Sequence, residues 1–228
     1  MPTSAARSPS APPLVVLRGV SVDVERTPVL RAVDFEVSPG EVVGLAGSNG
    51  SGKSTLLSVL ATLRKPRGGA ASVLGAELGT PKCAEVRPRI ALLGHVPALY
   101  AQLTLAENLR FLSRLLGRRE EDADAALEAV GLAGAVDRRA EQCSQGMRRR
   151  ADLARALLVE PSLLLLDEAH TGLDRHSAGL VDELVGRVRE RRGAAVVVSH
   201  ERDRLEALVD RVAEVVGGRV VEPVGEQR

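Results

Sequence analysis

A glycine-rich segment at residues 47–55, GSNGSGKST, has the residue types and the spacing of a phosphate-binding loop. Its glycines permit backbone angles that turn several N–H groups toward one anion, and a helix starting at Lys53 would add the positive end of its dipole. In this pattern the Lys53 ammonium group reaches the β- and γ-phosphates of a nucleotide, while the Ser54 hydroxyl binds Mg²⁺. The residues predicted to hold a nucleoside triphosphate are Gly47, Ser48, Asn49, Gly50, Ser51, Gly52, Lys53, Ser54 and Thr55.

Two acidic residues and one histidine follow apolar runs that are typical of buried strands. Asp167 and Glu168 come at the end of LLLLDE, and His200 ends VVVSH. Because the carboxyl ends of parallel strands meet at one edge of a sheet, these side chains are expected beside the phosphate loop. Asp167 is then a Mg²⁺ ligand together with Ser54, while Glu168 and His200 are the catalytic candidates, which polarise a water and contact the γ-phosphate. An acidic helix cap and a surface histidine are the structural alternatives.

Short apolar runs predict the sheet that carries these residues. EVVGLAG runs straight into the phosphate loop, and RIALLG, LLLLD and AAVVVSH are further runs of the buried, parallel type. LVVLRGVSVDV and PVLRAVDFEV predict an antiparallel pair, and RVAEVV with GRVVEPV predicts a closing hairpin. A helix is predicted after the phosphate loop because apolar residues recur there at helical spacing: Leu56, Leu57, Leu60 and Leu63.

A long, mostly helical stretch at roughly residues 104–160 separates two of these runs. ENLRFLSRLL, EEDADAALEAV and QGMRRRADLARALL fit helices with charges on their outer faces. We predict a single α/β domain over residues 14–222, whose core (14–95 and 161–222) is interrupted by a helical insertion at about 96–160. Residues 1–13, rich in Pro, Ser and Ala, are expected to be disordered, and residues 223–228 to form a flexible tail.

The composition argues against several classes of function. The 228 residues carry 31 Lys plus Arg against 30 Asp plus Glu, a balance that gives no reason to expect nucleic acid as a partner. One Tyr and two Phe offer no platform for stacked bases. The longest apolar stretches fall short of the roughly 18–20 residues that span a bilayer, and the first residues lack the apolar region of a secretory signal. Cys83 and Cys143 are expected to be free thiols.

Taken together and in this order, the motifs resemble those of the ATP-binding-cassette ATPases over about residues 14–222. The set comprises the phosphate loop, a switch segment around His95, CSQGM at residues 143–147, LLLLDEAHTGLD and VVVSH. The resemblance implies a P-loop nucleotide-hydrolase fold, in which a RecA-like core carries an antiparallel β subdomain and a helical subdomain with the signature motif. It also implies ATP and Mg²⁺ as ligands and ATP hydrolysis as the activity.

The resemblance further implies a head-to-tail dimer, in which each ATP lies between the phosphate loop of one subunit and the signature motif of the other. The signature here is CSQGM where the family usually has LSGGQ, so that Ser144 and Gly146 are the retained residues. The Ser144 hydroxyl and the N–H groups at the start of the following helix would bind the γ-phosphate held by the second subunit. An ordinary helix N-cap is the alternative role of Ser144. Asp174 matches the loop that links the two sites across the dimer.

Three departures from the family pattern stand out. Val24 takes the place of the aromatic residue that usually stacks on adenine, which leaves the choice between ATP and GTP open. His95, in LLGHVPALY, takes the place of the switch glutamine that helps to hold Mg²⁺; an imidazole still accepts a hydrogen bond, and a structural histidine is the alternative. Ala169 replaces the usual proline after Glu168, with little expected effect on the chemistry.

The departures at Val24 and His95 are similar to those of one subgroup, the ATPase subunit of the haem exporter used in cytochrome c maturation. This similarity favours haem export as the function. Drug- and antibiotic-efflux ATPases, which have a similar CSQGMRRR-like region, are the first alternative. A soluble cassette ATPase that remodels a protein or nucleic-acid complex is the second.

A transport function would require other polypeptides. The resemblance implies integral-membrane permease subunits, a second ATP-binding cassette, most simply another copy of this chain, and a place at the cytoplasmic face of the cell membrane. The expected docking surface for the permease is the region from His95 to Leu105, with Leu99, Tyr100 and Leu103 as apolar contacts. These three side chains are equally consistent with a small local core.

Overall fold

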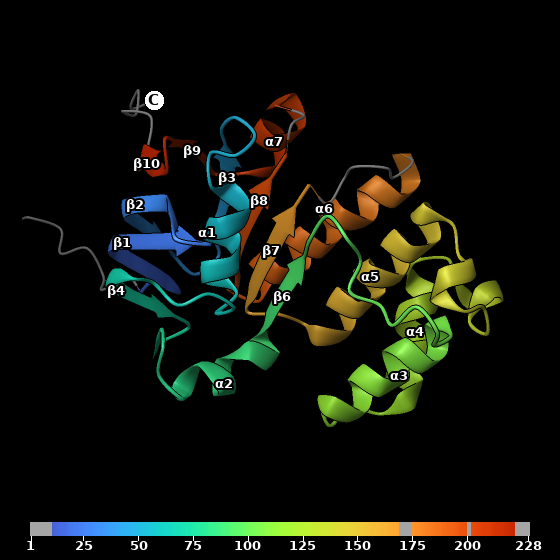
Figure 1. The fold of residues 1–228 in the computed structure, drawn as a ribbon. Helices are drawn as coiled ribbons and strands as arrows, with labels where there is room; N and C mark the ends of the chain where they lie inside the picture. Colours follow the sequence, from blue (N-terminus) through green and yellow to red (C-terminus); the bar gives the residue numbers. More distant parts are fainter. Residues whose placement is uncertain (1–10, 169–174, 200–201, 222–228) are drawn as a thin grey trace, which may run out of the picture.

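The chain is built on two β-sheets, the larger of which is mostly parallel (Figure 1). The computed structural model describes residues 11–168, 175–199 and 202–221. The larger sheet has the strand order β10-β9-β3-β8-β7-β6, with β9 through β6 paired in parallel and β10 antiparallel to β9. The predicted buried strands and the closing hairpin are therefore confirmed. The strands are β3 (Val42–Ala46), β6 (Ile90–Leu93), β7 (Leu163–Asp167), β8 (Ala194–Val198), β9 (Arg211–Val216) and β10 (Arg219–Val221).

The smaller sheet is antiparallel and begins with the predicted hairpin. Its order is β2-β1-β4-β5, and Glu25 and Arg26 form the turn between the first two strands with φ angles of 49° and 67°. Positive φ at two successive residues matches the right-handed twist of a tight hairpin. The strands are β1 (Val15–Val24), β2 (Thr27–Val37), β4 (Gly68–Val73) and β5 (Ala76–Glu77).

Helix α1 (Lys53–Leu60) follows the phosphate loop and shares one apolar core with both sheets. Leu56, Leu57 and Leu60 are buried in that core, as predicted, but the helix ends at Leu60 and Leu63 is 67% exposed. The prediction that Leu63 continues the apolar face was wrong. Thr62 adopts a left-handed φ of 59°, and the Arg87 guanidinium donates to its hydroxyl at 3.0 Å and to its carbonyl at 3.1 Å, so the chain turns away from the helix axis.

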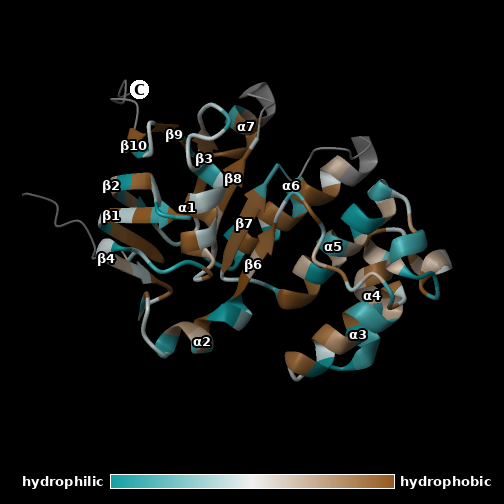
Figure 2. Cartoon of the chain, viewed as in Figure 1, coloured by the Kyte–Doolittle hydropathy of each residue, from teal (hydrophilic) through white to brown (hydrophobic). Residues whose placement is uncertain are grey.

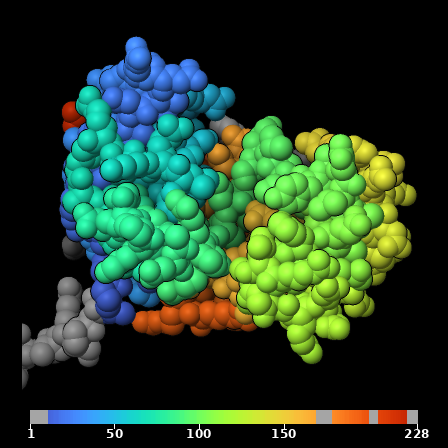
Figure 3. Space-filling view, turned by 60° about the horizontal axis from the view of Figure 1, so that its bottom comes forward, coloured from blue at the N-terminus to red at the C-terminus, as the bar shows by residue number. Residues whose placement is uncertain are grey.

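Three helices form a separate lobe, which we call the helical lobe (Figure 3). They are α3 (Leu105–Leu115), α4 (Glu120–Ala129) and α5 (Gln145–Val159), all within the stretch predicted to be helical. Figure 2 shows polar residues along the outer surfaces of these helices and apolar residues along the strands. The remaining elements are α2 (Lys82–Val86), α6 (Arg175–Glu190), α7 (Arg202–Leu208) and the 3₁₀ turns η1 (Arg87–Arg89), η2 (Ala133–Ala135) and η3 (Ala140–Gln142).

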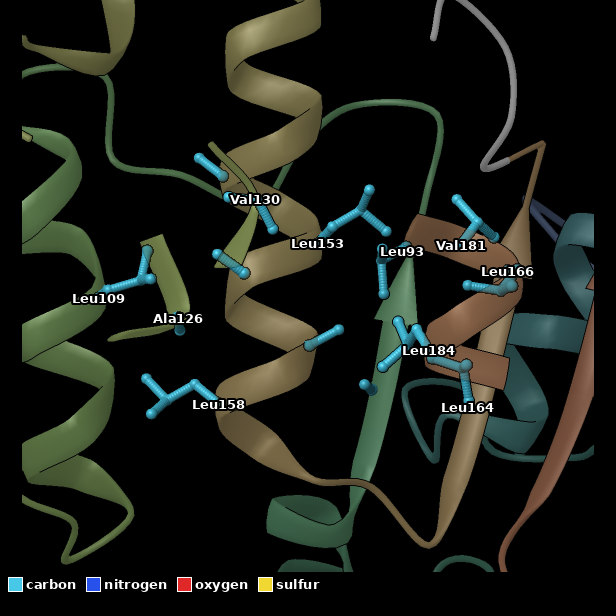
Figure 4. Packing of buried hydrophobic residues seen from close by; sticks show 14 of the residues in the cluster. Leu93, Leu109, Ala126, Val130, Leu153, Leu158, Leu164, Leu166, Val181 and Leu184 are labelled. Carbon is cyan, nitrogen blue, oxygen red and sulfur yellow. The ribbon is translucent and has the colours of Figure 1, made fainter. Parts of the chain in front are cut away.

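Helix α5 joins the helical lobe to the large sheet (Figure 4). It packs against α3 and α4 on one side and against β6 and α6 on the other. Leu153 is 1% exposed, and the cluster around it includes Leu109 and Val130 from the helical lobe and Leu93 and Leu184 from the side of the sheet. A displacement of α5 would therefore disturb packing in both parts of the molecule.

Side-chain caps mark the start of two helices in this lobe. The Thr104 hydroxyl accepts a hydrogen bond from the Glu107 amide at 3.1 Å, and the Glu107 carboxylate accepts one from the Thr104 amide at 2.7 Å, which completes a capping box. This bond to the Thr104 backbone lowers the pKa of Glu107. Ser144 caps α5 by accepting a bond from the Met147 amide at 3.2 Å.

The prediction that all charges of the α5 segment lie on its outer face was wrong. Arg149 is 5% exposed and Asp152 is fully buried. They are tolerated because they form a compact charge cluster, in which Asp152 lies 2.8 Å from Arg155 and 3.8 Å from Arg149.

Several other expectations concern the ends of the chain and its surroundings. Residues 1–10 and 222–228, which include most of the segments expected to be disordered or flexible, lie outside the described residues, so the predicted domain boundaries stay predictions. Within the described ranges no helix combines the length and the apolar character needed to cross a membrane. Cys83 and Cys143 are buried free thiols, as predicted.

Candidate functional site

The phosphate loop depends on two glycines for its shape. Gly47 has a φ of 137°, and a Cβ atom there would lie 2.4 Å from the Val215 carbonyl oxygen. Gly52 has a φ of 114°, and a Cβ atom there would lie 2.9 Å from the Leu30 side chain. Any other residue at these positions would have to displace its neighbours and adopt a strained backbone. The loop can therefore follow this path only with glycine at both positions.

Polar groups of the loop converge in the way that an anion requires. Lys53 is 8% exposed, and its ammonium group donates to the carbonyls of Gly47 at 2.8 Å and Ser48 at 2.9 Å, which keeps the positive charge inside the loop. The buried Ser51 hydroxyl has no hydrogen-bond partner among the described residues. The N-terminus of α1 opens at the same place. A phosphate group would satisfy the orphaned hydroxyl and the helix terminus together.

A cleft of about 430 Å³ lies over this loop and joins it to two other parts of the chain. Val24 and Val29, from the antiparallel sheet, form an apolar part of the wall, and Glu168, the residue after β7, also lines the cleft. The loop residues that line the cleft are Asn49, Gly50, Gly52, Lys53, Ser54 and Thr55. The fold thus brings the phosphate loop, Val24 and Glu168 to one cavity, as the sequence-based hypothesis requires.

The main chain of Glu168 is held at the carboxyl edge of the sheet. Asp167 pairs with Val198 in the β7–β8 ladder, and the Glu168 amide donates to the Val198 carbonyl at 3.0 Å. Its φ of 55° lies in the left-handed region, which is uncommon for a residue with a side chain. The Arg149 guanidinium donates to the Glu168 carbonyl at 3.1 Å. The unusual conformation is therefore held from two sides.

Ser54, which lines the cleft, and Asp167, which ends β7, suit Mg²⁺ only in combination with a nucleotide. The Ser54 hydroxyl and the Asp167 carboxylate are hard oxygen donors of the kind that Mg²⁺ prefers. No group of three or more His, Cys, Asp or Glu side chains that could hold a metal occurs in the part of the chain that the structure describes. Phosphate oxygens and water would have to complete the coordination, as is usual for Mg²⁺ bound with a nucleotide.

His95 lies beside the nucleotide cleft and not in its wall. It is exposed, and it lines a small neighbouring cleft of about 20 Å³ with Pro97, Gln145, Arg149 and Glu168. Glu168 belongs to the walls of both clefts. We define residues 94–98 as the switch segment. A change in its conformation would therefore alter the surroundings of Glu168.

Ser144 and Gly146, two of the remaining predicted site residues, do not reach the cleft within one chain. Ser144 is exposed and caps α5, and a Cβ atom at Gly146 would meet nothing within 4 Å. Neither lines the two clefts described above. Asp174 and His200 lie outside the described residues, so their predicted roles stay predictions.

The expected docking surface is only partly assembled as predicted. A groove of about 440 Å³ is lined by His95 and Leu99, together with residues of the α5 N-terminus. Tyr100 is 60% exposed and packs edge-on against Phe111, with 5.7 Å between ring centroids, and neither it nor Leu103 lines the groove.

Sequence reasoning missed two residues of the site, Val29 and Arg149. Val29 reaches the cleft because β1 and β2 pair, which places it near Val24. Arg149 is one of three consecutive arginines, and its burial cannot be read from that run. The signal that was available is the spacing of Arg149, Asp152 and Arg155 three residues apart, which places opposite charges on one face of a helix.

Comparisons with known proteins agree with this arrangement. A family model described as ABC transporter matches residues 30–171. The daunorubicin/doxorubicin resistance ATP-binding protein DrrA of Streptomyces peucetius is 38% identical over 199 residues, which cover 86% of this chain and 60% of that protein, less than two thirds of its length. The cytochrome c biogenesis ATP-binding export protein CcmA of Xanthomonas campestris pv. campestris (strain 8004) is 39% identical over 192 residues, which cover 84% of this chain and 88% of that protein.

Solved structures show the same fold. An ATP-binding subunit of an ABC transporter superposes with a TM-score of 0.84 at 29% identity, over 91% of this chain and 88% of that chain. A second cassette, described as a dimer in a post-hydrolysis state bound to ADP and Pi, superposes with a TM-score of 0.81 at 24% identity, over 90% of this chain and 96% of that chain. With a family model that matches more than half of its length, this chain belongs to the ABC transporter family and has the fold of its ATP-binding subunits.

Proposed function

We propose that this chain powers a membrane exporter and that Glu168 is the general base of its ATP hydrolysis. The observation that carries the proposal is the single cleft that joins the phosphate loop to Glu168. ATP bound with its phosphates on the loop would have its γ-phosphate in the same cavity as a carboxylate. A general base needs only a hydrogen-bonded path to the attacking water.

The residues divide the chemistry between them. The loop N–H groups and the Lys53 ammonium stabilise the charge on the phosphates, a contribution of preorganised electrostatics that dominates phosphoryl transfer. Glu168 accepts a proton from water while the water oxygen bonds to the γ-phosphorus and the bond to the β-phosphate oxygen breaks, which yields ADP and phosphate. His200 is the proposed contact to the γ-phosphate. Mg²⁺, held by Ser54 and Asp167 when bound, would neutralise part of the phosphate charge.

A second copy of the chain would complete the site. Ser144 and Gly146 lie at the exposed start of α5, outside the walls of the nucleotide cleft, so they are available to a nucleotide on another subunit. The similar cassette described as a dimer with ADP and Pi supports this arrangement. Permease subunits would dock at the groove beside His95 and Leu99, and the cassettes would then lie at the cytoplasmic face of the membrane.

Glu168→Gln tests the role of the base. This variant should bind ATP and dimerise but release phosphate at least about 100-fold more slowly, because an amide cannot take the proton. Phosphate release and light scattering of the purified chain with Mg²⁺ and ATP measure both properties. Glu160→Gln is the matched control, because Glu160 forms surface ion pairs with Arg118 and Arg191. Normal steady-state turnover by the Glu168 variant contradicts the proposal.

For the cargo, we propose haem, exported for cytochrome c maturation. His95 in place of the switch glutamine and Val24 in place of an aromatic residue support this choice, as does the CcmA relative at 39% identity. Deletion of the gene in its own host should abolish haem staining of c-type cytochromes. The wild-type gene should restore the staining, and the Glu168→Gln gene should not.

Drug efflux is the second candidate, favoured by the similarity to DrrA, a relative named for resistance to daunorubicin and doxorubicin. The same deletion strain distinguishes the two. Unchanged c-type cytochromes together with increased sensitivity to a drug would support efflux and exclude the haem proposal.

A further inference from the structure

A buried arginine connects helix α5 to the switch segment and to Glu168. Arg149 lies in α5 and is 5% exposed. Its guanidinium donates to the Gly94 carbonyl at 2.5 Å and to the Glu168 carbonyl at 3.1 Å. One side chain thus holds three segments that are far apart in the sequence: α5, the switch segment and the residue after β7.

The charge of Arg149 is opposed by a carboxylate of α5 and by one at the end of β7. Asp152, one turn further along the helix, lies 3.8 Å from Arg149 and 2.8 Å from Arg155, and Arg155 donates to the Leu92 carbonyl at 2.9 Å. Burial lowers the pKa of Arg149, while Asp152 and Asp167 oppose that shift. The guanidinium is a planar fork with several donors, so it can hold two carbonyls at fixed positions.

The conformation of Glu168 gives this contact a consequence. A φ of 55° is disfavoured for a residue with a side chain, so the backbone keeps it only where surrounding contacts hold it. Two such contacts are the hydrogen bond from the Glu168 amide to Val198 and the bond from Arg149 to its carbonyl. Without Arg149, rotation about the N–Cα bond of Glu168 toward a more favourable φ becomes easier, and this rotation moves the side chain together with the carbonyl group.

We propose that Arg149 is a positioning residue for ATP hydrolysis, which sets the main chain of Glu168 according to the positions of α5 and the switch segment. The inference rests on the proposed role of Glu168 as the general base. Helix α5 is capped by Ser144 and packs both on the other helices of the helical lobe and on β6 and α6. A movement of the end of α5 that carries Ser144 would therefore reach the main chain of Glu168 through Arg149. In this role it acts through the main chain of Glu168.

Arg149→Met tests the proposal, because methionine keeps the volume of the stem and removes all donors. Asp152 retains Arg155 as its partner in this variant. We expect kcat for ATP hydrolysis to fall about 10- to 100-fold, as for a base displaced by about 1 Å, while the Kd for ATP changes less than about threefold. Phosphate release and calorimetric titration with ATP measure these two quantities.

Arg150→Met is the matched control, since Arg150 is the next residue and also donates to main-chain carbonyls. Its bonds go to Val130 at 3.2 Å and Gly131 at 3.3 Å, both within the helical lobe. This variant should keep kcat within about threefold even where its unfolding midpoint falls as far as that of Arg149→Met. Equal losses of kcat in the two variants, or an unchanged kcat in Arg149→Met, would overturn the proposal.

Two further measurements keep the result interpretable. If Arg149→Met does not fold, Arg149→Lys replaces it: an ammonium can reach one carbonyl, so kcat should fall less while the Kd stays unchanged, and a wild-type kcat overturns the proposal. Millimolar guanidinium should raise kcat of Arg149→Ala, whereas equal NaCl should not; no recovery beyond that in NaCl counts against the proposal. An inactive Glu168→Gln variant beside a fully active Arg149→Met variant would refute this inference alone and leave the proposed function intact.

Discussion

Lys53 and Arg149 are two buried cations that donate hydrogen bonds to main-chain carbonyl groups, but the chain forms the two contacts in different ways. Lys53 bonds to Gly47 and Ser48, which are six and five residues before it. Arg149 bonds to Gly94 and Glu168, which are 55 and 19 residues away. The first contact is made within one loop, and the second exists only when a helix, a switch segment and a strand end have come together.

This difference indicates that Lys53 and Arg149 have different roles at the same site. A cation fixed by its own loop keeps its place relative to the phosphates whatever the rest of the molecule does. A cation that bonds to separate segments, as Arg149 does, keeps its position only while those segments keep their arrangement. We therefore expect changes at Lys53 to affect the affinity for ATP and the rate together, and changes at Arg149 to affect the rate.

Among the variants that test this comparison, Lys53→Ala has the largest expected effect. We expect ATP hydrolysis to fall at least about 100-fold and ATP to bind about tenfold more weakly, because a charged hydrogen-bond donor to the phosphates is lost. Phosphate release and calorimetric titration measure the two effects. Lys65→Ala is the control, because Lys65 is exposed and does not line the cleft. A wild-type Kd in Lys53→Ala would remove the distinction between the two cations.

Asp152→Asn tests the Arg149 part of this comparison, because Asp152 lies next to Arg149 in α5 and the free energy of unfolding measures its contribution. Asp152 is fully buried between Arg149 and Arg155, so its neutralisation removes the carboxylate charge that the two guanidinium groups share. We expect a loss of about 3 kcal/mol in the free energy of unfolding, measured by chemical denaturation. Asp124→Asn, which breaks the surface pair with Arg110, should cost far less. Equal losses in the two variants would show that the buried cluster has no special weight.

Thr104→Ala has the smallest expected effect and disturbs the helical lobe without contact to either cation. Loss of the cap should lower stability by about 1 kcal/mol and leave kcat unchanged. A large change in kcat would mean that any disturbance of the helical lobe affects Glu168.

The pKa of Glu107 is lowered by its bond to the Thr104 backbone. The contribution of this bond to stability is therefore complete above the usual carboxyl pKa near 4.5 and disappears as the pH falls through the lowered value. Chemical denaturation of the wild-type chain between pH 7 and pH 3 measures this loss of stability.

Much of the fold could be predicted because its signals are local. The strands of the large sheet are continuous apolar runs, since they are buried on both faces, and the helical stretch begins and ends at capping residues such as Thr104. The errors occur where burial depends on distant contacts. Leu63 fits the helical period but lies beyond a turn that Arg87 holds, and Arg149 is charged but buried beside Asp152.

By itself, the sequence determined the phosphate loop, the acidic strand end and the family, because glycine freedom, helix starts and strand ends are properties of neighbouring residues. Only the tertiary structure decided that Val29 joins Val24 at the cleft, that Ser144 stays away from it within one chain, and that Arg149 holds Glu168. Such contacts depend on how lobes and strands pack, and packing joins residues whose separation along the chain carries no signal.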